Sequence, residues 1–205
     1  MTEFGLPHVA AAVLGYLLGS IPFGLVLTRM AGLGDIRSIG SGNIGATNVL
    51  RTGHKGLALA TLLLDGGKGA AAVLIARAIS EDLTIIAGGT AIIGHVLPVW
   101  LKFKGGKGVA TALGTLIASN WMVGIGACLV WLIAAFLFRY SSLAALIAVT
   151  SAPFLALWLG TEPQVWLAVF AAFLVWNRHH ENIRRLLKGE EPKIGKKKEA
   201  PASPQ

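Results

Sequence analysis

The stretch WMVGIGACLVWLIAAFLF, residues 121–138, decides the class of fold because none of its side chains is charged. A helix needs about 20 apolar residues to cross the hydrocarbon core of a bilayer. Six further apolar segments lie on either side of it, at residues 7–29, 57–79, 83–101, 109–118, 143–160 and 163–177. The sequence therefore predicts an all-α, polytopic integral membrane protein with about seven transmembrane helices.

The composition of the 205-residue chain supports this class. Hydrophobic residues make up 54% and charged residues only 14%, against about 25% charged in a typical soluble domain. The formal net charge of +8 would suggest a nucleic-acid partner in a soluble protein. Membrane proteins instead hold excess Lys and Arg in cytoplasmic loops, so we expect no nucleic acid. Cys128 lies in an apolar segment, and no spacing of metal ligands surrounds it.

The basic residues predict the orientation of the chain. All of the 18 except Lys68 and Arg77 lie in alternate connections or after the last segment. If all seven segments cross, including the short 109–118, these basic groups share one side. The positive-inside rule then places the N-terminus in the periplasm and the C-terminus in the cytoplasm. We expect a membrane domain over 1–189 and a disordered basic tail over 190–205, either solvated or touching anionic lipid headgroups.

The first polar connection, GDIRSIGSGNIGATNVLRTGHKG at 34–56, is typical of a binding loop. Glycine allows a ligand to approach the backbone closely, short polar side chains supply hydrogen bonds, and Arg51 supplies a planar fork suited to phosphate. The alternative is a flexible polar loop. The candidate binding residues here are Ser41, Gly42, Asn43, Gly45, Thr47, Asn48 and Arg51.

The second polar cluster, DGGKG at 65–69, lies inside an apolar segment. Asp65 and Lys68 share one face of a helix because they are three residues apart. Ionisable residues at membrane depth are costly and are usually functional or paired. A structural ion pair and a substrate contact both fit this pattern.

The third cluster is GHVLPVWLKFKGGKGVAT at 94–111. Backbone amides in a glycine-rich turn ahead of a helix can hold an anion, and Lys107 adds a positive charge. It is not a Walker A loop, since Leu101 and Gly108 stand where that motif requires Gly and Ser or Thr. The alternative is a juxtamembrane turn that binds lipid headgroups. The candidates are His95, Lys104, Gly105, Gly106, Lys107 and Gly108.

The fourth cluster, NRHHENIRRLL at 177–187, predicts an amphipathic helix at the membrane surface. His179, Asn182 and Arg185 are spaced along one polar face, and Leu186 belongs to the apolar stripe. A lone histidine is more often structural than catalytic. A plain anchor, however, would not need His and Asn on the same face.

Motifs of other enzyme classes are missing from the sequence. It contains no G-x-S-x-G elbow, no H-E-x-x-H and no His followed five residues later by Asp. Anion-binding turns, cations and a membrane suit an enzyme on which a phosphorylated polar substrate meets a lipid-like one. A transporter for a phosphorylated metabolite, built on broken helices, is the alternative.

These motifs resemble a known family. SGNIGATNVLR at 41–51, GHVLP with FKGGKGVAT at 94–111, and RHHENIRRL at 178–186 are similar to bacterial membrane glycerol-3-phosphate acyltransferases that use acyl phosphate. The resemblance implies a seven-helix inner-membrane enzyme with its active site on the cytoplasmic side. It implies that acyl phosphate and glycerol 3-phosphate give 1-acyl-glycerol 3-phosphate and inorganic phosphate, the first acylation of phospholipid synthesis, with no cofactor or metal. An enzyme that produces acyl phosphate is then the expected functional partner.

The resemblance also implies which residues form the site. The catalytic set is Ser41, Arg51, Lys107, His179 and Asn182. Ser142, in the YSS sequence at 140–142, is a further contributor. Either His179 or a phosphoryl oxygen of the substrate takes the proton of the attacking hydroxyl. The second is favoured, because the sequence places no carboxylate to orient the histidine.

Overall fold

The computed structural model describes residues 4–195, and within them every regular element is helical. The α-helices are α1 Leu6–Gly19, α2 Phe23–Met30, α3 Ala46–Leu50, α4 Lys55–Arg77, α5 Leu83–Val96, α6 Val109–Ser119, α7 Trp121–Phe138, α8 Ser141–Leu159, α9 Glu162–Arg178 and α10 His180–Leu187. Two short 3₁₀ helices, η1 Ile36–Ser38 and η2 Val99–Leu101, complete the set. The predicted all-α class is correct.

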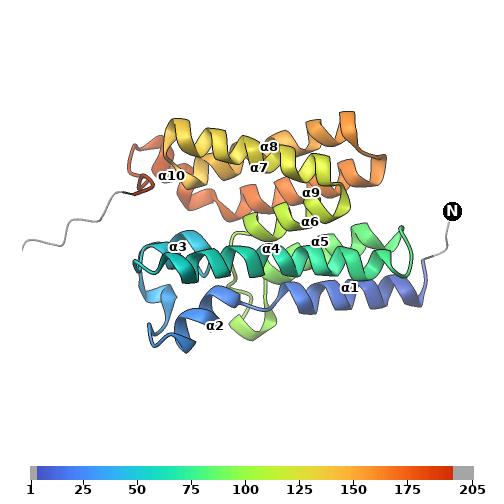
Figure 1. Cartoon of the computed structure of the whole chain (residues 1–205), viewed down its shortest axis with the longest axis horizontal. Helices are drawn as coiled ribbons and strands as arrows, with labels where there is room; N and C mark the ends of the chain where they lie inside the picture. Colours follow the sequence, from blue (N-terminus) through green and yellow to red (C-terminus); the bar gives the residue numbers. More distant parts are fainter. Residues whose placement is uncertain (1–3, 196–205) are drawn as a thin grey trace, which may run out of the picture.

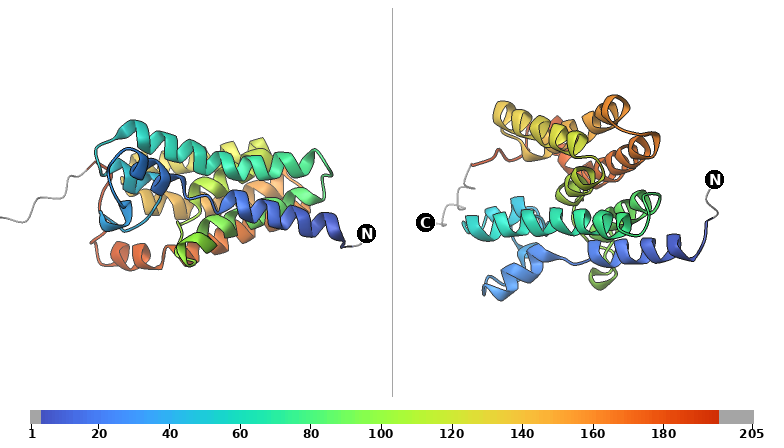
Figure 2. Two further views of the ribbon diagram at one scale, coloured as in Figure 1. Left: turned by 90° about the horizontal axis from the view of Figure 1, so that it is seen from below. Right: turned by 45° about the vertical axis from the view of Figure 1, so that its right-hand side comes forward.

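The long helices run along one axis of the molecule, so the connections gather at two ends (Figure 1). One end, here called the site end, carries α2, α3, the α7–α8 junction and α10 (Figure 2). The other end carries the α4–α5, α6–α7 and α8–α9 connections. The segment 97–108 differs from both, because it lies within the length of the bundle.

Two of the predicted continuous segments are broken. The segment 7–29 divides into α1 and α2 at Ser20–Pro22, because proline lacks an amide and disfavours a helical conformation in the residue before it. The segment 83–101 stops as an α-helix at Val96, two residues before Pro98. Both breaks leave polar backbone groups in the interior, where other residues must satisfy them.

Within residues 4–195, five segments are long and apolar enough to cross a bilayer. They are Leu6–Met30, Lys55–Arg77, Leu83–Leu101, Trp121–Phe138 and Ser141–Leu159. At 1.5 Å per residue, the 11 residues of α6 extend only about 16 Å, and α9 has 17 residues. The protein is therefore an integral, multi-pass membrane protein with shorter apolar helices packed among its longer ones.

Alanine is the most frequent buried apolar residue of the bundle, and most of its aromatic side chains face outward. α1 packs on α5, α4 on α6, and α7 on α8. A side chain on Gly19 would overlap the carbonyl of Ala91, so glycine lets α1 and α5 approach closely. Phe136 and Trp158 are 84% and 89% exposed. Such an apolar surface is stable because lipid, not water, surrounds it.

Candidate active site

Asn48 organises the first polar loop. Its side-chain oxygen accepts hydrogen bonds from the backbone amide of Ser41 at 3.1 Å and from Arg51 at 3.3 Å. Its amide nitrogen donates to the carbonyls of Ile36, Ile39 and Asn43 at 2.8–3.0 Å. Asn48 is buried, and its polar atoms are used within the loop. Asn48 therefore holds Ser41 and Arg51 in place within the loop.

The remaining candidates of this loop fall into three groups. Ser41 and Gly42 lie exposed on its surface, and Gly42 has a φ of 68°, which favours glycine. Asn43 and Gly45 form a local turn, in which the Gly45 amide donates to the Asn43 side chain at 3.3 Å. Thr47 lies 3.2 Å from the hydroxyl of Ser141, which joins the loop to the start of α8.

The third and fourth motifs meet in a buried network. The Nζ of Lys107 donates to the side-chain oxygen of Asn182. The amide nitrogen of Asn182 donates to Glu191 at 2.6 Å, and the hydroxyl of Ser142 donates to the same carboxylate oxygen at 2.6 Å. Arg185 donates to the other carboxylate oxygen at 2.7 Å. Residues more than 70 positions apart in the chain thus share one polar centre.

Positive charge accumulates around this network. Burial lowers the pKa of Lys107, the charge of Glu191 opposes this, and the positive charges of Arg185 and Arg51 add to it, so that the pKa is about 8. Arg51 is thus close enough for its charge to act on Lys107, so the first motif belongs to the same site. Lys107, Arg51 and Arg185 outnumber the two carboxylates near them, Glu191 and Glu181, and this excess of positive charge suits a phosphorylated ligand.

His179 is oriented by a backbone carbonyl. Its Nδ1 lies 2.7 Å from the carbonyl oxygen of Val175. Since a carbonyl can only accept, Nδ1 carries the hydrogen and Nε2 keeps a lone pair. Burial lowers the pKa of His179 to about 4, helped by the positive charges of Lys107 and Arg178. The ring is therefore neutral near pH 7.

The glycine turn, Gly105–Gly108, differs in part from its predicted role. The amide of Gly105 donates to the carbonyl of Val96 at 3.1 Å, and that of Gly106 donates to the carbonyl of His95 at 3.0 Å. These two amides are occupied and are not free to hold an anion. Gly108, with a φ of 84°, caps α6. The first-turn amides of α6, which lack intrahelical partners, are the donors that remain for an anion.

The Asp65–Lys68 pair is buried in the bundle. Lys68 Nζ donates to Asp65 at 2.7 Å and to the carbonyl of Ile21 at 2.7 Å. His95, also buried, packs beside Asp65. This arrangement favours the ion-pair interpretation over a substrate contact. Lys104 lies exposed on the segment 97–108, away from the polar network.

Glu191 and Arg178 are not among the site residues predicted from the sequence. Glu191 was assigned to the disordered tail, yet it is 8% exposed and ties α8 to α10. Residues 190–195 therefore pack against the domain, while 196–205 lie outside the described residues. One signal was available: Glu191 is one of only 10 acidic residues, and it stands among basic ones. Arg178 donates weakly, at 3.4 Å, to the carbonyls of Gly105 and Gly106.

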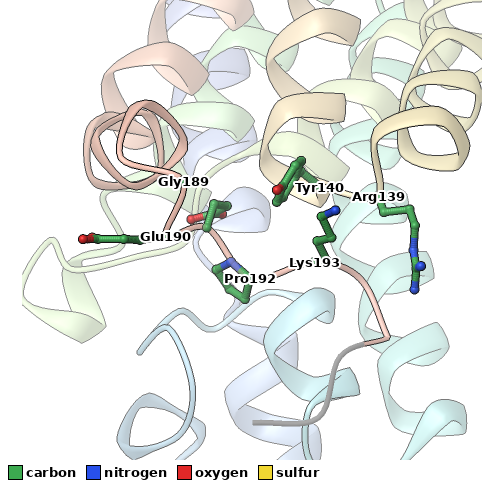
Figure 3. A pocket seen from close by; sticks show the side chains of 7 residues that line it. Arg139, Tyr140, Gly189, Glu190, Pro192 and Lys193 are labelled. Atoms are coloured by element: carbon green, nitrogen blue, oxygen red, sulfur yellow. The ribbon is translucent and has the colours of Figure 1, made fainter.

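A hollow of about 450 Å³ lies beside the network (Figure 3). Figure 3 shows Lys193 near Tyr140, and its Nζ is 5.6 Å from the centre of that ring. The hollow is lined by Arg139, Tyr140 and residues 189–193, including Glu191. Glu191 is the lining residue that connects it to Asn182 and Ser142.

The fold and the site together define a class: multi-pass helical membrane proteins with a cationic binding site at one end of the bundle. The model of a family described as glycerol-3-phosphate acyltransferase matches residues 9–189. The chain belongs to this family, as the resemblance of its motifs indicated.

Relatives agree over nearly the whole chain. A glycerol-3-phosphate acyltransferase of Rhodospirillum rubrum is 60% identical, covering 92% of each chain. One from Paramagnetospirillum magneticum is 59% identical, covering 94% of this chain and 96% of its own.

Solved structures agree as well. The crystal structure of PlsY, an integral membrane glycerol 3-phosphate acyltransferase, in its glycerol 3-phosphate form has a TM-score of 0.87 and 40% identity, covering 92% of this chain and 96% of that one. The lysophosphatidic acid form has a TM-score of 0.85 and 38% identity, covering 92% and 95%. The chain is a glycerol-3-phosphate acyltransferase of the PlsY type, and the transporter alternative is set aside.

Proposed function

We propose that this enzyme uses acyl phosphate as its acyl donor and works at the cytoplasmic face of the bacterial inner membrane. The observation that carries the proposal is the convergence of Arg51, Lys107 and Arg185 on one site beside an apolar bundle. The solved relative was crystallised in glycerol 3-phosphate and lysophosphatidic acid forms. Two phosphorylated substrates would bring several negative charges, which this excess of cations suits.

The substrates are assigned to different parts of the site. Lys107 and the first turn of α6 hold the acyl phosphate, because that turn offers free amides and the positive end of a helix dipole. Arg51, His179 and Asn182 hold glycerol 3-phosphate, with Ser41 beside them. This arrangement brings the 1-hydroxyl to the acyl carbonyl, and positioning of this kind is a major part of catalysis.

The reaction is a direct transfer. The hydroxyl oxygen forms a bond to the carbonyl carbon, and the bond from that carbon to the phosphate oxygen breaks, with its electron pair leaving on inorganic phosphate. Nearby cations stabilise the developing oxyanion. The hydroxyl proton passes to a phosphoryl oxygen. His179 is a weak base, since its pKa is about 4, and its Nε2 accepts a hydrogen bond from the second hydroxyl of glycerol 3-phosphate, which orients the reacting one.

The proposed orientation has seven crossings, with the N-terminus in the periplasm and the C-terminus in the cytoplasm. The Lys and Arg residues of the α2–α4 and α9–α10 regions gather at the site end, which supports this orientation through the positive-inside rule. Acyl phosphate would then reach the site from an enzyme that produces it in the cytoplasm or at the membrane surface. No cofactor enters the scheme.

The donor can be tested with the purified enzyme in phospholipid nanodiscs. Labelled glycerol 3-phosphate is supplied with palmitoyl phosphate or, as a control, with palmitoyl-CoA. We expect labelled lysophosphatidic acid and an equal amount of inorganic phosphate with palmitoyl phosphate alone. Faster product formation from palmitoyl-CoA would reject the proposed donor.

The orientation is tested separately by labelling single cysteines, introduced at Thr52 and at Ser80 in a Cys128→Ala background, with an impermeant maleimide. In intact cells the reagent should label Ser80→Cys and spare Thr52→Cys. Labelling of Thr52→Cys from outside would overturn the cytoplasmic site.

The proposal predicts the pH dependence of kcat/KM. Lys107 holds phosphate only when protonated, and its pKa is about 8. Activity should therefore be highest near pH 7, fall to about half near pH 8 and continue to fall at higher pH. On the acidic side, kcat/KM should begin to fall near about pH 6, where the phosphate of the substrate gains a proton. Lys107→Arg, whose guanidinium stays charged, should remove the alkaline limb. His179→Gln should leave both limbs in place, and loss of the acidic limb in that variant would identify His179 as the base.

A further inference from the structure

We propose that Asp65, Lys68 and His95 form a buried brace that positions the glycine turn and, through it, Lys107. They act as positioning residues and not as substrate contacts. The inference rests on the proposed role of Lys107 in holding the acyl phosphate. The brace joins three parts of the fold: the α1–α2 break, the middle of α4 and the end of α5.

The first half of the brace fixes the helix break. Lys68 donates to Asp65 and to the carbonyl of Ile21, each at 2.7 Å, and both charged side chains are only 2% exposed. The Ile21 carbonyl lies in the break between α1 and α2, where its backbone donor is the Phe23 amide at 3.1 Å, and Lys68 gives it a second hydrogen bond. Lys68 therefore satisfies an interior backbone group, and its charge is balanced by Asp65.

The second half of the brace joins Asp65 to the glycine turn. His95 Nδ1 lies 3.7 Å from the Asp65 carboxylate and is buried with no hydrogen-bond partner among the described residues. An orphaned polar atom in the interior is costly. Closing this gap by a few tenths of an ångström would satisfy it, and hydrogen bonds at active sites often tighten when the substrate binds.

His95 holds the turn in two ways. Its carbonyl accepts the Gly106 amide at 3.0 Å, and its ring lies directly against Gly106. A side chain at position 106 would overlap Nε2 of the ring, and the three atoms nearest to it all belong to His95. Lys107 is the next residue, so a displacement of the His95 ring moves the cation. The ring and the Asp65–Lys68 pair leave no exposed surface for a substrate.

A double-mutant cycle between His95 and Gly106 tests the brace. Gly106→Ala should raise the KM for palmitoyl phosphate by about 10-fold or more, because a misplacement of about 1 Å can cost 10²-fold. Its effect on kcat should be smaller. In the His95→Ala background, the same Gly106→Ala change should cost less than about 2-fold, because the ring that it strikes is gone. Equal losses in both backgrounds would reject the coupling.

Hydrogen exchange gives a readout that does not depend on the reaction. In wild-type protein, amides of residues 99–111 should exchange slowly, and His95→Ala and Asp65→Asn should speed their exchange while exchange in α7 and α8 stays the same. If His95→Ala does not fold, His95→Asn replaces it in the experiment. Asparagine keeps a hydrogen-bond donor toward Asp65 but lacks the ring that contacts Gly106. Unchanged exchange in the folded variants would overturn the brace, whatever the acyl donor proves to be.

Gly67→Ala is the matched control, since Gly67 lies between Asp65 and Lys68 and a side chain there meets nothing within 4 Å. It should alter neither KM nor exchange. A fall in kcat with an unchanged KM in the Asp65 and His95 variants would identify them as catalytic groups and reject the positioning role. Failure of palmitoyl phosphate as a donor would reject the proposed function and leave the exchange result standing.

Discussion

Replacing Lys107 by Met is expected to lower kcat/KM by about 10²–10³-fold, the usual cost of removing one charged or hydrogen-bonding group from a transition state. Met keeps the length of the side chain but loses the charge. Lys107 connects the glycine turn to Asn182, and it is the cation nearest to the free amides of α6. The measurement is steady-state kinetics with palmitoyl phosphate and glycerol 3-phosphate, each varied in turn.

Lys104→Met is the matched control for this prediction. Lys104 belongs to the same basic stretch, three residues earlier, but it is exposed. The alternative is that Lys107 acts only through general attraction of the charged substrates to a positive membrane surface. Both variants would then lose similar activity, and a higher salt concentration would lower the activity of the wild-type enzyme. We expect Lys104→Met to stay within about 2-fold of wild type. Similar losses in the two variants would contradict a specific phosphate site at Lys107.

Glu191→Ala is expected to destabilise the site end of the bundle and to abolish most activity. The carboxylate accepts hydrogen bonds from Ser142, Asn182 and Arg185, and its removal leaves Arg185 without its buried partner. Breaking such a pair costs about 3–5 kcal/mol, and somewhat less is expected here because Arg185 is only half-buried. The measurements are thermal unfolding in detergent and product formation.

The pH dependence of stability offers a second measurement on Glu191. Burial raises the pKa of its carboxyl, but the donors from Ser142, Asn182 and Arg185 outweigh burial and hold the pKa below its usual value. A lowered pKa means that Glu191 stabilises the fold above about pH 4.5, and this contribution is lost as the pH falls further. In Glu191→Ala, the stability should no longer show this decrease at low pH. Glu190→Ala, at an exposed neighbour, should retain the wild-type behaviour in both measurements.

The apolar helices were the most predictable part of the fold. The expected segment 121–138 coincides with α7, and 143–160 and 163–177 agree with α8 and α9 within two residues. The helix breaks were less predictable. Pro22 and Pro98 were visible in the sequence, but both lie in apolar runs long enough to cross a bilayer without interruption. Because hydropathy is averaged over many residues, a single proline does not interrupt a predicted segment. The predicted segments therefore ran from α1 into α2 and from α5 to residue 101.

The site residues divide in the same way. Arg51, Lys107, His179 and Asn182 were predicted as site residues from three motifs, and these motifs meet at the network around Glu191. The role of Asn48 was not predictable, because a buried hub and an exposed ligand contact use the same polar side chain. The occupied amides of Gly105 and Gly106 were hidden for a related reason: their acceptors are backbone carbonyls at the end of α5, which no residue type marks.

The sequence by itself determined that this chain is a multi-pass helical membrane protein, and it predicted which motifs carry the chemistry. Both follow from local properties, since a bilayer imposes a minimum apolar length on each helix and a phosphate site needs particular residue types close together. Only the tertiary structure decided that Glu191 belongs to the site, that Asn48 supports its neighbours and that Lys68 satisfies the Ile21 carbonyl. These roles depend on which polar groups meet in the interior, and each buried group takes whatever partner the packing of distant helices brings within reach.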